Sequence, residues 1–246
     1  MCTVTFIPRS NGYCLGMNRD ELLTRHIARP PKRETVISGV LCPTEPGGGT
    51  WIALNEKHVC LALINWYSVT ARVEGKPVSR GKIIQAARDA DEPDSVQSVL
   101  DKLPIERINP FRLIGIFPDS REILEWRWNL KRLVCQKQPW QTQQWISSGF
   151  DEVTAQKIRS ETFRRAQHQR SAGSLDWLRR LHRSHAPQAG PFSTCMHRED
   201  AASVSYTEVM VSPRQARMRY HAGAPCGQTF HFAGSAVELP GGELRK

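Results

Sequence analysis

The amino terminus of the 246-residue chain brings a thiol and a possible proton acceptor into a single residue. Cys2 follows Met1, and a small second residue permits removal of the initiator methionine. We expect this removal, after which Cys2 carries both its thiol and a free α-amine. A terminal amine has a pKa of roughly 7.7–8.0, so near neutral pH it can take the proton of the neighbouring thiol. The first two residues therefore predict a cysteine nucleophile that needs no histidine.

The residues after Cys2 predict a hairpin that returns a carboxylate to it. Residues 2–6 alternate between apolar side chains and threonine at the period of a strand, and Asn11-Gly12 is a strong signal for a two-residue turn. A turn at this position pairs Cys2 with Asp20 or Glu21, within a couple of residues. An isolated Cys2 would instead be an ordinary small apolar residue of an edge strand, and the nearby carboxylates favour the catalytic interpretation.

A second polar group ends a strand that we expect to be buried on both faces. Residues 59–64 are apolar throughout, which is typical of a strand in the middle of a sheet, and Asn65 and Trp66 follow directly. An asparagine at the end of a strand commonly caps a loop. The three glycines at 47–49 suit either a turn that lines a pocket or a flexible loop.

These motifs resemble those of the NRDE family, the proteins similar to transport and Golgi organisation protein 2. Met1-Cys2, the hairpin, the segment Gly16 to Glu21 and the pattern from Gly48 to Asn65 carry the resemblance. More distantly, the chain resembles the choloylglycine hydrolase and penicillin V acylase group of N-terminal-nucleophile hydrolases. The resemblance implies that Cys2 attacks an amide, that Asp20 supports its amine, and that Asn65 donates to the oxyanion. It also implies an α+β fold, the four-layer α-β-β-α sandwich, where composition and periodicity indicate only mixed α and β.

The resemblance extends to residues that would contact a substrate. Arg80 stands at a helix start, where it can hold a carboxylate or phosphate or pair with a surface acid. A late segment before a strand is similar to one in the family and is expected to bring His197 or Arg198 toward the substrate. Ser148 stands where related proteins commonly have an asparagine, and Met17 where the hydrolases usually have an arginine. The predicted substrate-binding residues are Asn18, Arg19, Trp66, Arg80, Ser148, His197 and Arg198.

The remaining pattern fits one domain over residues 1–246. Hydrophobic residues make up 39% of the chain and charged residues 24%, enough for a substantial core. Helices are expected near residues 81–87, 95–103, 151–167 and 174–185, and strands near 111–117, 121–128, 130–135, 141–145, 203–211 and 216–220. We expect residues 111–145 to extend the second sheet. The chain has no apolar run that could span a bilayer and no signal peptide pattern, so we expect a cytoplasmic protein.

The cysteines indicate reduced thiols. All seven are scattered singly, without a Cys-x-x-Cys pair, and their number is odd. His182 and His185 share a spacing that can support a metal, but no carboxylate lies near them in the sequence. We therefore predict no metal site, no disulfide framework and no cofactor.

The net charge of +10 is concentrated in the two basic helices between residues 157 and 183. This stretch has no recognisable nucleic-acid module and few aromatic residues among its basic ones. A solvated helical face is the favoured interpretation, with an acidic substrate or a membrane surface as the alternative. We expect no nucleic-acid partner.

Two classes of function fit these residues. The first is an N-terminal cysteine amidohydrolase or acyltransferase that acts on a small amide or thioester. The second is a non-catalytic carrier or chaperone of haem or acyl-lipid with the same fold, in which Cys2 together with His197 or His221 contacts the ligand. Either one implies a small-molecule partner.

Overall fold

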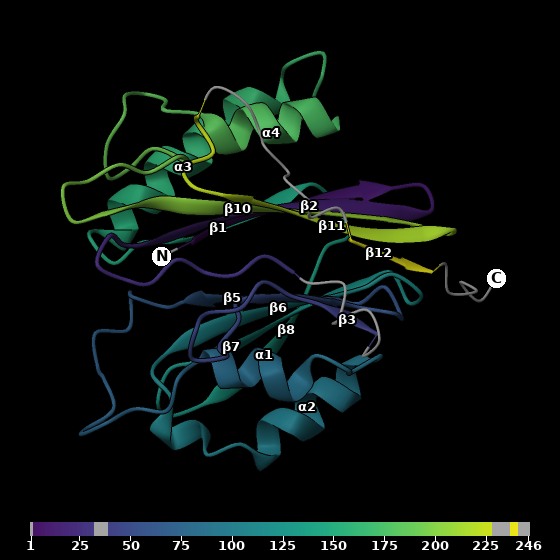
Figure 1. The fold of residues 1–246 in the computed structure, drawn as a ribbon, viewed down its shortest axis with the longest axis vertical. Helices are drawn as coiled ribbons and strands as arrows, with labels where there is room; N and C mark the ends of the chain where they lie inside the picture. The colour runs from purple at the N-terminus through teal and green to yellow at the C-terminus, as the bar shows by residue number, and fades with distance from the viewer. Residues whose placement is uncertain (1, 32–38, 228–236, 241–246) are drawn as a thin grey trace.

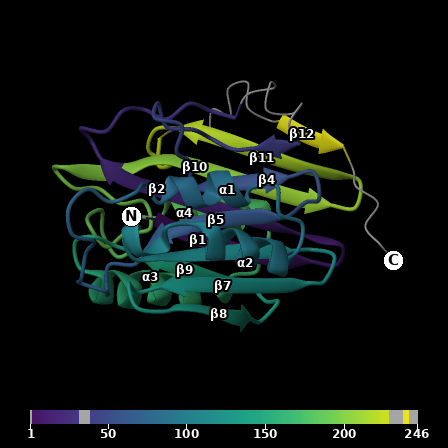
Figure 2. The ribbon, with the colours of Figure 1, turned by 90° about the horizontal axis from the view of Figure 1, so that it is seen from below.

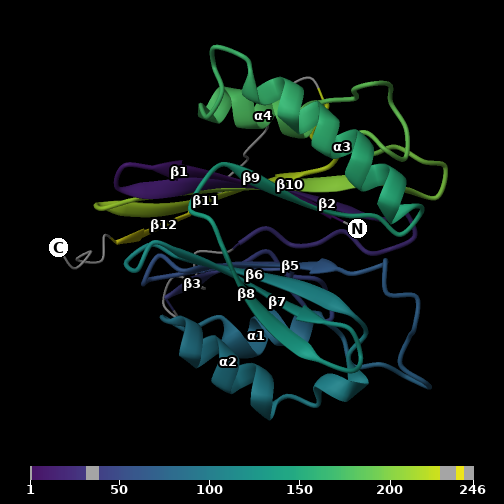
Figure 3. The ribbon, with the colours of Figure 1, turned by 180° about the vertical axis from the view of Figure 1, so that it is seen from behind.

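Two stacked β-sheets lie between two layers of helices (Figure 1). The computed structural model describes residues 2–31, 39–227 and 237–240. Helices α3 (Glu152–Gln167) and α4 (Leu175–Arg183) cover the outer face of one sheet. Helices α1 (Gly81–Ala87) and α2 (Pro93–Lys102) cover the outer face of the other, as Figure 2 and Figure 3 show from two further sides. The expected α-β-β-α sandwich is confirmed.

The first sheet contains the amino-terminal hairpin in its interior, between β10 and the edge strand β9, and all its paired strands are antiparallel. The long strand β10 pairs with β2, so a late segment of the chain lies directly beside the hairpin. In spatial order the strands are β12 (Val237–Pro240), β11 (Gln215–Ala222), β10 (Ala201–Ser212), β2 (Gly12–Leu22), β1 (Cys2–Arg9) and β9 (Gln143–Ser147).

The second sheet places the most apolar strand in its interior. β5 is buried along almost its whole length between β4 and β6, as its continuous apolarity predicts. A short 3-10 helix, Ile105–Arg107, precedes β6. The strand order is β3 (Val40–Leu41), β4 (Ile52–Asn55), β5 (Cys60–Asn65), β6 (Phe111–Phe117), β7 (Glu122–Trp128) and β8 (Leu133–Gln138).

Alternation along β1 separates two environments. Cys2, Val4 and Phe6 belong to the core between the sheets, whereas Thr3 and Thr5 contact side chains of the helical layer. Successive side chains of a strand point to opposite faces, so each face of the hairpin has its own partners. The Cys2 side chain therefore lies between the two sheets, and a reaction at its sulfur would take place there.

The register of the hairpin differs by two residues from a turn at Asn11-Gly12. Arg9 pairs with Gly12, the loop is Ser10-Asn11, and Cys2 pairs with Arg19. Gly12 has φ +143°, and a Cβ there would lie 2.1 Å from the carbonyl oxygen of Val211 on β10. The glycine thus serves the close approach of β10 and not the turn.

The expectation that residues 141–145 extend the second sheet is wrong. β9 pairs with β1 in the first sheet, which places Ser147 opposite Cys2. Just before β9, Trp140 packs edge-on against Phe6 and Tyr13 of the hairpin. These aromatic contacts hold the start of β9 beside β1. They join residues far apart in the sequence, so the periodicity of a single strand does not predict them.

None of the helices within the described ranges is long and apolar enough to cross a membrane.

Candidate functional site

A cavity of about 490 Å³ opens where β1 begins and β5 ends. Its walls come from segments that are far apart in the sequence: the start of β1, the end of β2, the glycine-rich segment, the end of β5 and the start of α1. The lining includes Cys2, Arg19, Asp20, Glu21, Arg25, Glu45, Gly49, Thr50, Trp51, Leu63, Asn65, Tyr67, Ser79, Arg80, Gly81 and Asn109. The three predicted catalytic residues are among them.

Cys2 lines the cavity and is only 6% exposed. Burial raises the pKa of its thiol, and the negative charges of Asp20 and Glu21 add to the rise, while the positive charges of the chain terminus and of Arg19 oppose it. The thiol is therefore held mainly protonated near neutral pH. A reaction at this sulfur requires a base that removes the proton during attack.

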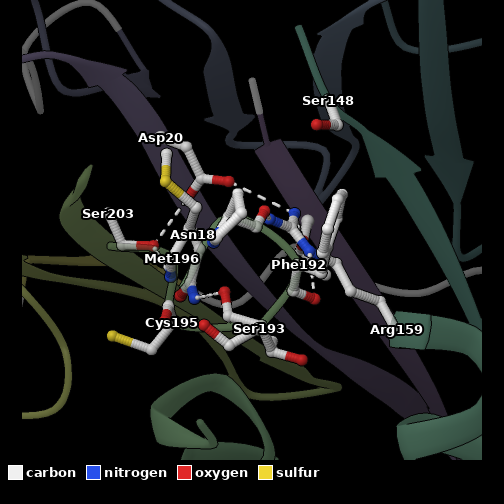
Figure 4. Close-up of polar contacts among 12 residues, drawn as sticks. Asn18, Asp20, Ser148, Arg159, Phe192, Ser193, Cys195, Met196 and Ser203 are labelled. Atoms are coloured by element: carbon white, nitrogen blue, oxygen red, sulfur yellow. Dashed lines mark hydrogen bonds and ion pairs between the residues drawn. The ribbon is translucent and has the colours of Figure 1, made fainter. Parts of the chain in front are cut away.

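Asp20 is a fully buried carboxylate with fixed partners on both oxygens. Its Oδ2 lies 3.2 Å from Nη1 of Arg159, and its Oδ1 accepts a hydrogen bond of 2.6 Å from the Ser203 hydroxyl (Figure 4). Ser203 in turn accepts a bond of 2.9 Å from the backbone amide of Met196. This chain of contacts fixes the orientation of the Asp20 carboxylate beside the cavity.

Arg159 is the main site residue that sequence reasoning assigned elsewhere. It was expected on a solvated helical face, yet its side chain is 0% exposed and also donates to Thr3 Oγ1 at 2.8 Å. The expectation holds better for Arg164 and Arg165, whose side chains are 68% and 78% exposed. Arg159 is buried because it pairs with Asp20 on the facing strand β2. The run of basic residues in the sequence does not indicate this contact.

Asn65, the last residue of β5, lines the cavity. Its Nδ2 donates to the Tyr67 hydroxyl at 2.7 Å, which uses one of its two amide hydrogens. The second hydrogen can serve an acceptor in the cavity. Tyr67 was not among the predicted residues and sets the rotamer of Asn65.

The cavity wall carries charges of both signs. Arg19 pairs with Glu45 and Glu21 and stacks over the Trp51 ring at 4.5 Å. Arg80 donates to the Pro110 carbonyl at 3.2 Å and forms no salt bridge with a carboxylate of the described residues. Burial lowers the pKa of its guanidinium without making it neutral near pH 7. Arg80 thus keeps its positive charge in the wall of the cavity.

Five predicted substrate-binding residues lie outside the cavity lining: Asn18, Trp66, Ser148, His197 and Arg198. Ser148 is buried and accepts a bond from the Phe150 amide, and Arg198 pairs with Asp200 at 2.8 Å. Figure 4 shows Ser148 well apart from the cluster around Asp20. His197 lies beside other histidine and cysteine side chains, in the cluster described below.

Asn18 fastens β2 to the helical layer. Its Nδ2 donates to the carbonyl oxygens of His182 and Thr194, both at 2.9 Å, and its Oδ1 lies 3.0 Å from His182 Nδ1. The other ring nitrogen of His182 meets Thr5 Oγ1 at 3.0 Å. These contacts use the whole amide and leave it no free group for a substrate.

Solved structures with a similar fold are N-terminal-nucleophile hydrolases. The C2A mutant of conjugated bile acid hydrolase from Clostridium perfringens superposes with a TM-score of 0.53, at 12% identity, over 90% of this chain and 89% of that one. An N-acylethanolamine-hydrolyzing acid amidase ortholog from Caenorhabditis elegans also gives 0.53, at 12% identity, over 98% and 100%. At such identities the likeness establishes the fold class. A search of curated protein sequences gives no match.

Residues 1–179 match the family described as Transport and Golgi organisation 2, and the chain belongs to this family.

The buried pair of Asp20 and Arg159 leads to a stability prediction. Arg159→Met leaves the Asp20 carboxylate buried without its cation, so we expect the free energy of unfolding in urea to fall by about 3–5 kcal/mol. Arg165→Met, on the exposed side of the same helix, should change it by less than about 0.5 kcal/mol. Equal effects of the two substitutions would contradict the role of the pair. Adding Asp20→Asn to Arg159→Met should recover part of the loss.

The buried imidazole of His182 leads to a pH prediction. Burial, with a smaller contribution from Arg159, lowers the pKa of His182 to about 3, whereas an unfolded histidine titrates near 6.5. Between pH 6.5 and 3, His182 is protonated in the unfolded chain but stays neutral in the folded chain. The stability contribution is therefore complete above pH 6.5 and is lost progressively as the pH falls toward 3. Between pH 7 and 5.5 the loss amounts to roughly 1 kcal/mol.

Urea unfolding at pH 7 and pH 5.5 measures this contribution. His182→Gln should reduce the difference between the two pH values by roughly 1 kcal/mol, since glutamine does not titrate. His168→Gln, at an exposed position, should leave the difference unchanged. The same pH dependence in wild type and His182→Gln would show that another group is responsible.

Proposed function

We propose that the chain is an N-terminal cysteine amidohydrolase or acyltransferase that acts on a small amide or thioester once Met1 is removed. The observation that carries the proposal is that Cys2, Asp20 and Asn65, separated by up to 63 residues, line one cavity. A volume of about 490 Å³ suits a small molecule. The family and the fold support a hydrolase-like architecture, while the activity rests on the site itself. Met1 lies outside the described residues.

The reaction uses only groups of the chain and water. The Cys2 sulfur attacks the carbonyl carbon while its proton passes to the α-amine of the same residue. Asp20 holds this amine, and Asn65 donates to the oxyanion. Collapse of the tetrahedral intermediate breaks the C–N or C–S bond, and the proton leaves with the departing group. Water, or another acceptor in a transferase, then releases the acyl group from the sulfur.

The electrostatics of Cys2 favour proton transfer during attack. Because burial raises the pKa of the thiol, a standing thiolate is scarce, and the adjacent amine must act as a general base. Asp20 would keep that amine oriented, since both of its oxygens are already fixed by Arg159 and Ser203.

The charges of the wall favour a substrate with an anionic group. Arg80 forms no salt bridge with the described carboxylates and lies in the same cavity as Cys2, so it would hold a carboxylate or phosphate of the substrate. Glu21 and Glu45 are already paired with Arg19. A small, anionic amide or thioester fits this wall better than a long acyl chain.

A carrier of haem or acyl-lipid is the alternative, and one observation favours it: the Cys2 thiol is buried and poorly ionised, as an unreactive thiol is. His197 does not line the cavity with Cys2, so it would not join Cys2 at a ligand there. A haem carrier would give a visible absorption band on reconstitution with haem. The free state of all seven cysteines fits a reducing compartment such as the cytoplasm for either function.

Mass spectrometry of the purified protein tests the nucleophile. We expect an intact mass without Met1, and, after incubation with a small activated ester that bears a carboxylate, one acyl adduct on the Cys2 peptide. Cys135, the exposed thiol, serves as the internal control for nonspecific acylation. Retention of Met1, or acylation of Cys135 as fast as Cys2, would exclude the mechanism.

An insertion variant separates the thiol from the amine. With one alanine inserted between Met1 and Cys2, the thiol remains but the terminal amine moves to another residue. We expect the adduct on this cysteine peptide to disappear, and Cys2→Ala, which lacks the thiol, should give the same result. If the inserted variant is acylated at the wild-type rate, the α-amine is not the base.

The acylation rate also tests the oxyanion donor. Asn65→Ala should slow formation of the Cys2 adduct by roughly 10²–10³-fold, the usual cost of losing one such donor. Asn129→Ala, in the turn between β7 and β8 and not among the residues that line the cavity, should leave the rate unchanged. A fall of less than about threefold in Asn65→Ala would remove Asn65 from the proposed mechanism.

A further inference from the structure

Four potential metal ligands from three segments meet outside the cavity. His185 follows α4, Cys195 and His197 lie in the segment that leads to β10, and Cys226 follows β11. One ligand atom from each lies within 4.8 Å of all the others. All four residues come after residue 179, where the family match ends.

Three of the six separations between the ligand atoms are close to those of a tetrahedral site, and the other three are at most 4.8 Å. The Nε2 atom of His197 lies 3.1 Å from Nε2 of His185, 3.5 Å from the Cys195 sulfur and 3.4 Å from the Cys226 sulfur. Zinc bonds of about 2.0–2.1 Å to nitrogen and 2.3 Å to sulfur place tetrahedral ligands roughly 3.3–3.8 Å apart. The four atoms therefore surround a space of the size that one zinc ion takes.

Hydrogen bonding explains this convergence poorly. A neutral imidazole nitrogen has either one hydrogen or one lone pair, so Nε2 of His197 can make one good hydrogen bond. Three heavy atoms nonetheless approach it to 3.5 Å or less. A cation in the centre satisfies all four groups at once.

Backbone contacts hold the ligand segments in place without a metal. The Cys195 amide donates to the Ser184 carbonyl at 3.0 Å, and the His197 amide donates to the Gly190 carbonyl at 3.1 Å. Arg183, at the end of α4, donates to the Gly227 carbonyl at 3.1 Å and so fastens the turn that carries Cys226. The ligand set is thus supported by the fold on all three segments.

We propose that His185, Cys195, His197 and Cys226 bind one Zn²⁺ ion as a closed structural site. Two thiolates and two imidazoles are a common ligand set for structural zinc, and four protein ligands leave no open position for catalysis. On binding, each thiol loses its proton to solvent, and the two thiolates neutralise the charge of the ion. This proposal reverses the sequence expectation of no metal, which rested on local spacing of cysteines and histidines.

The site would also stabilise the support of Asp20. Met196, between two of the ligands, donates to Ser203, which donates to Asp20. Figure 4 shows Cys195, Met196, Ser203 and Asp20 in this order across the cluster. The metal ligands therefore fix the segment that contains Met196, and through Met196 they hold Ser203, one of the partners of the Asp20 carboxylate.

Metal content of the reduced protein tests the site. The full chain is reduced, equilibrated with Zn²⁺, freed of unbound metal by gel filtration and measured by elemental mass spectrometry. We expect one zinc per chain. In a parallel sample Co²⁺ should give the intense visible bands of tetrahedral coordination together with a thiolate-to-metal charge-transfer band.

Variants assign the ligands. Cys226→Ser and His185→Gln should each lower the retained zinc at least tenfold, whereas Cys135→Ser and His168→Gln should keep one equivalent. Cys2→Ala should also keep it, so the outcome is independent of the proposed catalytic function. If a ligand variant fails to fold, the Co²⁺ spectrum of the wild type decides by itself.

Three results would overturn the proposal. These are a reduced wild-type chain that retains no zinc, a Co²⁺ spectrum without tetrahedral or thiolate bands, and retention of the metal by both ligand variants. A disulfide between Cys195 and Cys226 in the reduced, zinc-treated protein, seen as a loss of two hydrogens in the peptide mass, would equally exclude it.

Discussion

The buried ion pair of Asp20 and Arg159 is the constraint on which the candidate site depends. Both side chains are 0% exposed, so each charge is removed from water and needs the other. Arg159 also donates to Thr3 and reaches the carbonyl oxygens of Pro191 and Phe192 at 3.4 Å. One guanidinium thus joins α3 to β1, β2 and the segment before β10. Where these elements meet, the Asp20 carboxylate and Cys2 line the same cavity.

Many of the individual helices and strands were predictable from periodicity, whereas the four-layer architecture was implied by the family resemblance. The apolar strand that ends at Asn65 lies inside its sheet, and the helices and most strands fall near their predicted positions. Local alternation and turn signals specify such elements because they depend on neighbours in the sequence. The joining of β9 to β1 depends instead on Trp140 packing against the hairpin, and no local pattern reports it.

The residues of the candidate site also divide into those that local motifs indicate and those that depend on long-range contacts. Cys2, Asp20, Asn65, Arg19 and Arg80 were predicted from motifs and do share a cavity. Arg159 was not, because the buried face of α3 consists of Glu152, Ala155 and Arg159 and carries almost no apolar signal. By contrast α4 buries Trp177, Leu178 and Leu181, a face that its sequence shows clearly. A polar buried face can be recognised only when its partner, here Asp20, is known.

Arg159 and Ser203 hold Asp20 in different ways. This difference distinguishes the proposed catalytic function from the proposed zinc site. Arg159 acts directly through charge, from a helix within the family match. Ser203 donates a hydrogen bond directly to Asp20 and is itself held by the Met196 amide, in a segment that zinc would fix, and both residues lie beyond that match. Loss of zinc would loosen the second support while leaving the charge pair and the Cys2 thiol intact. Zinc would therefore affect how firmly the Asp20 carboxylate is oriented. The Cys2 nucleophile would be present with or without zinc.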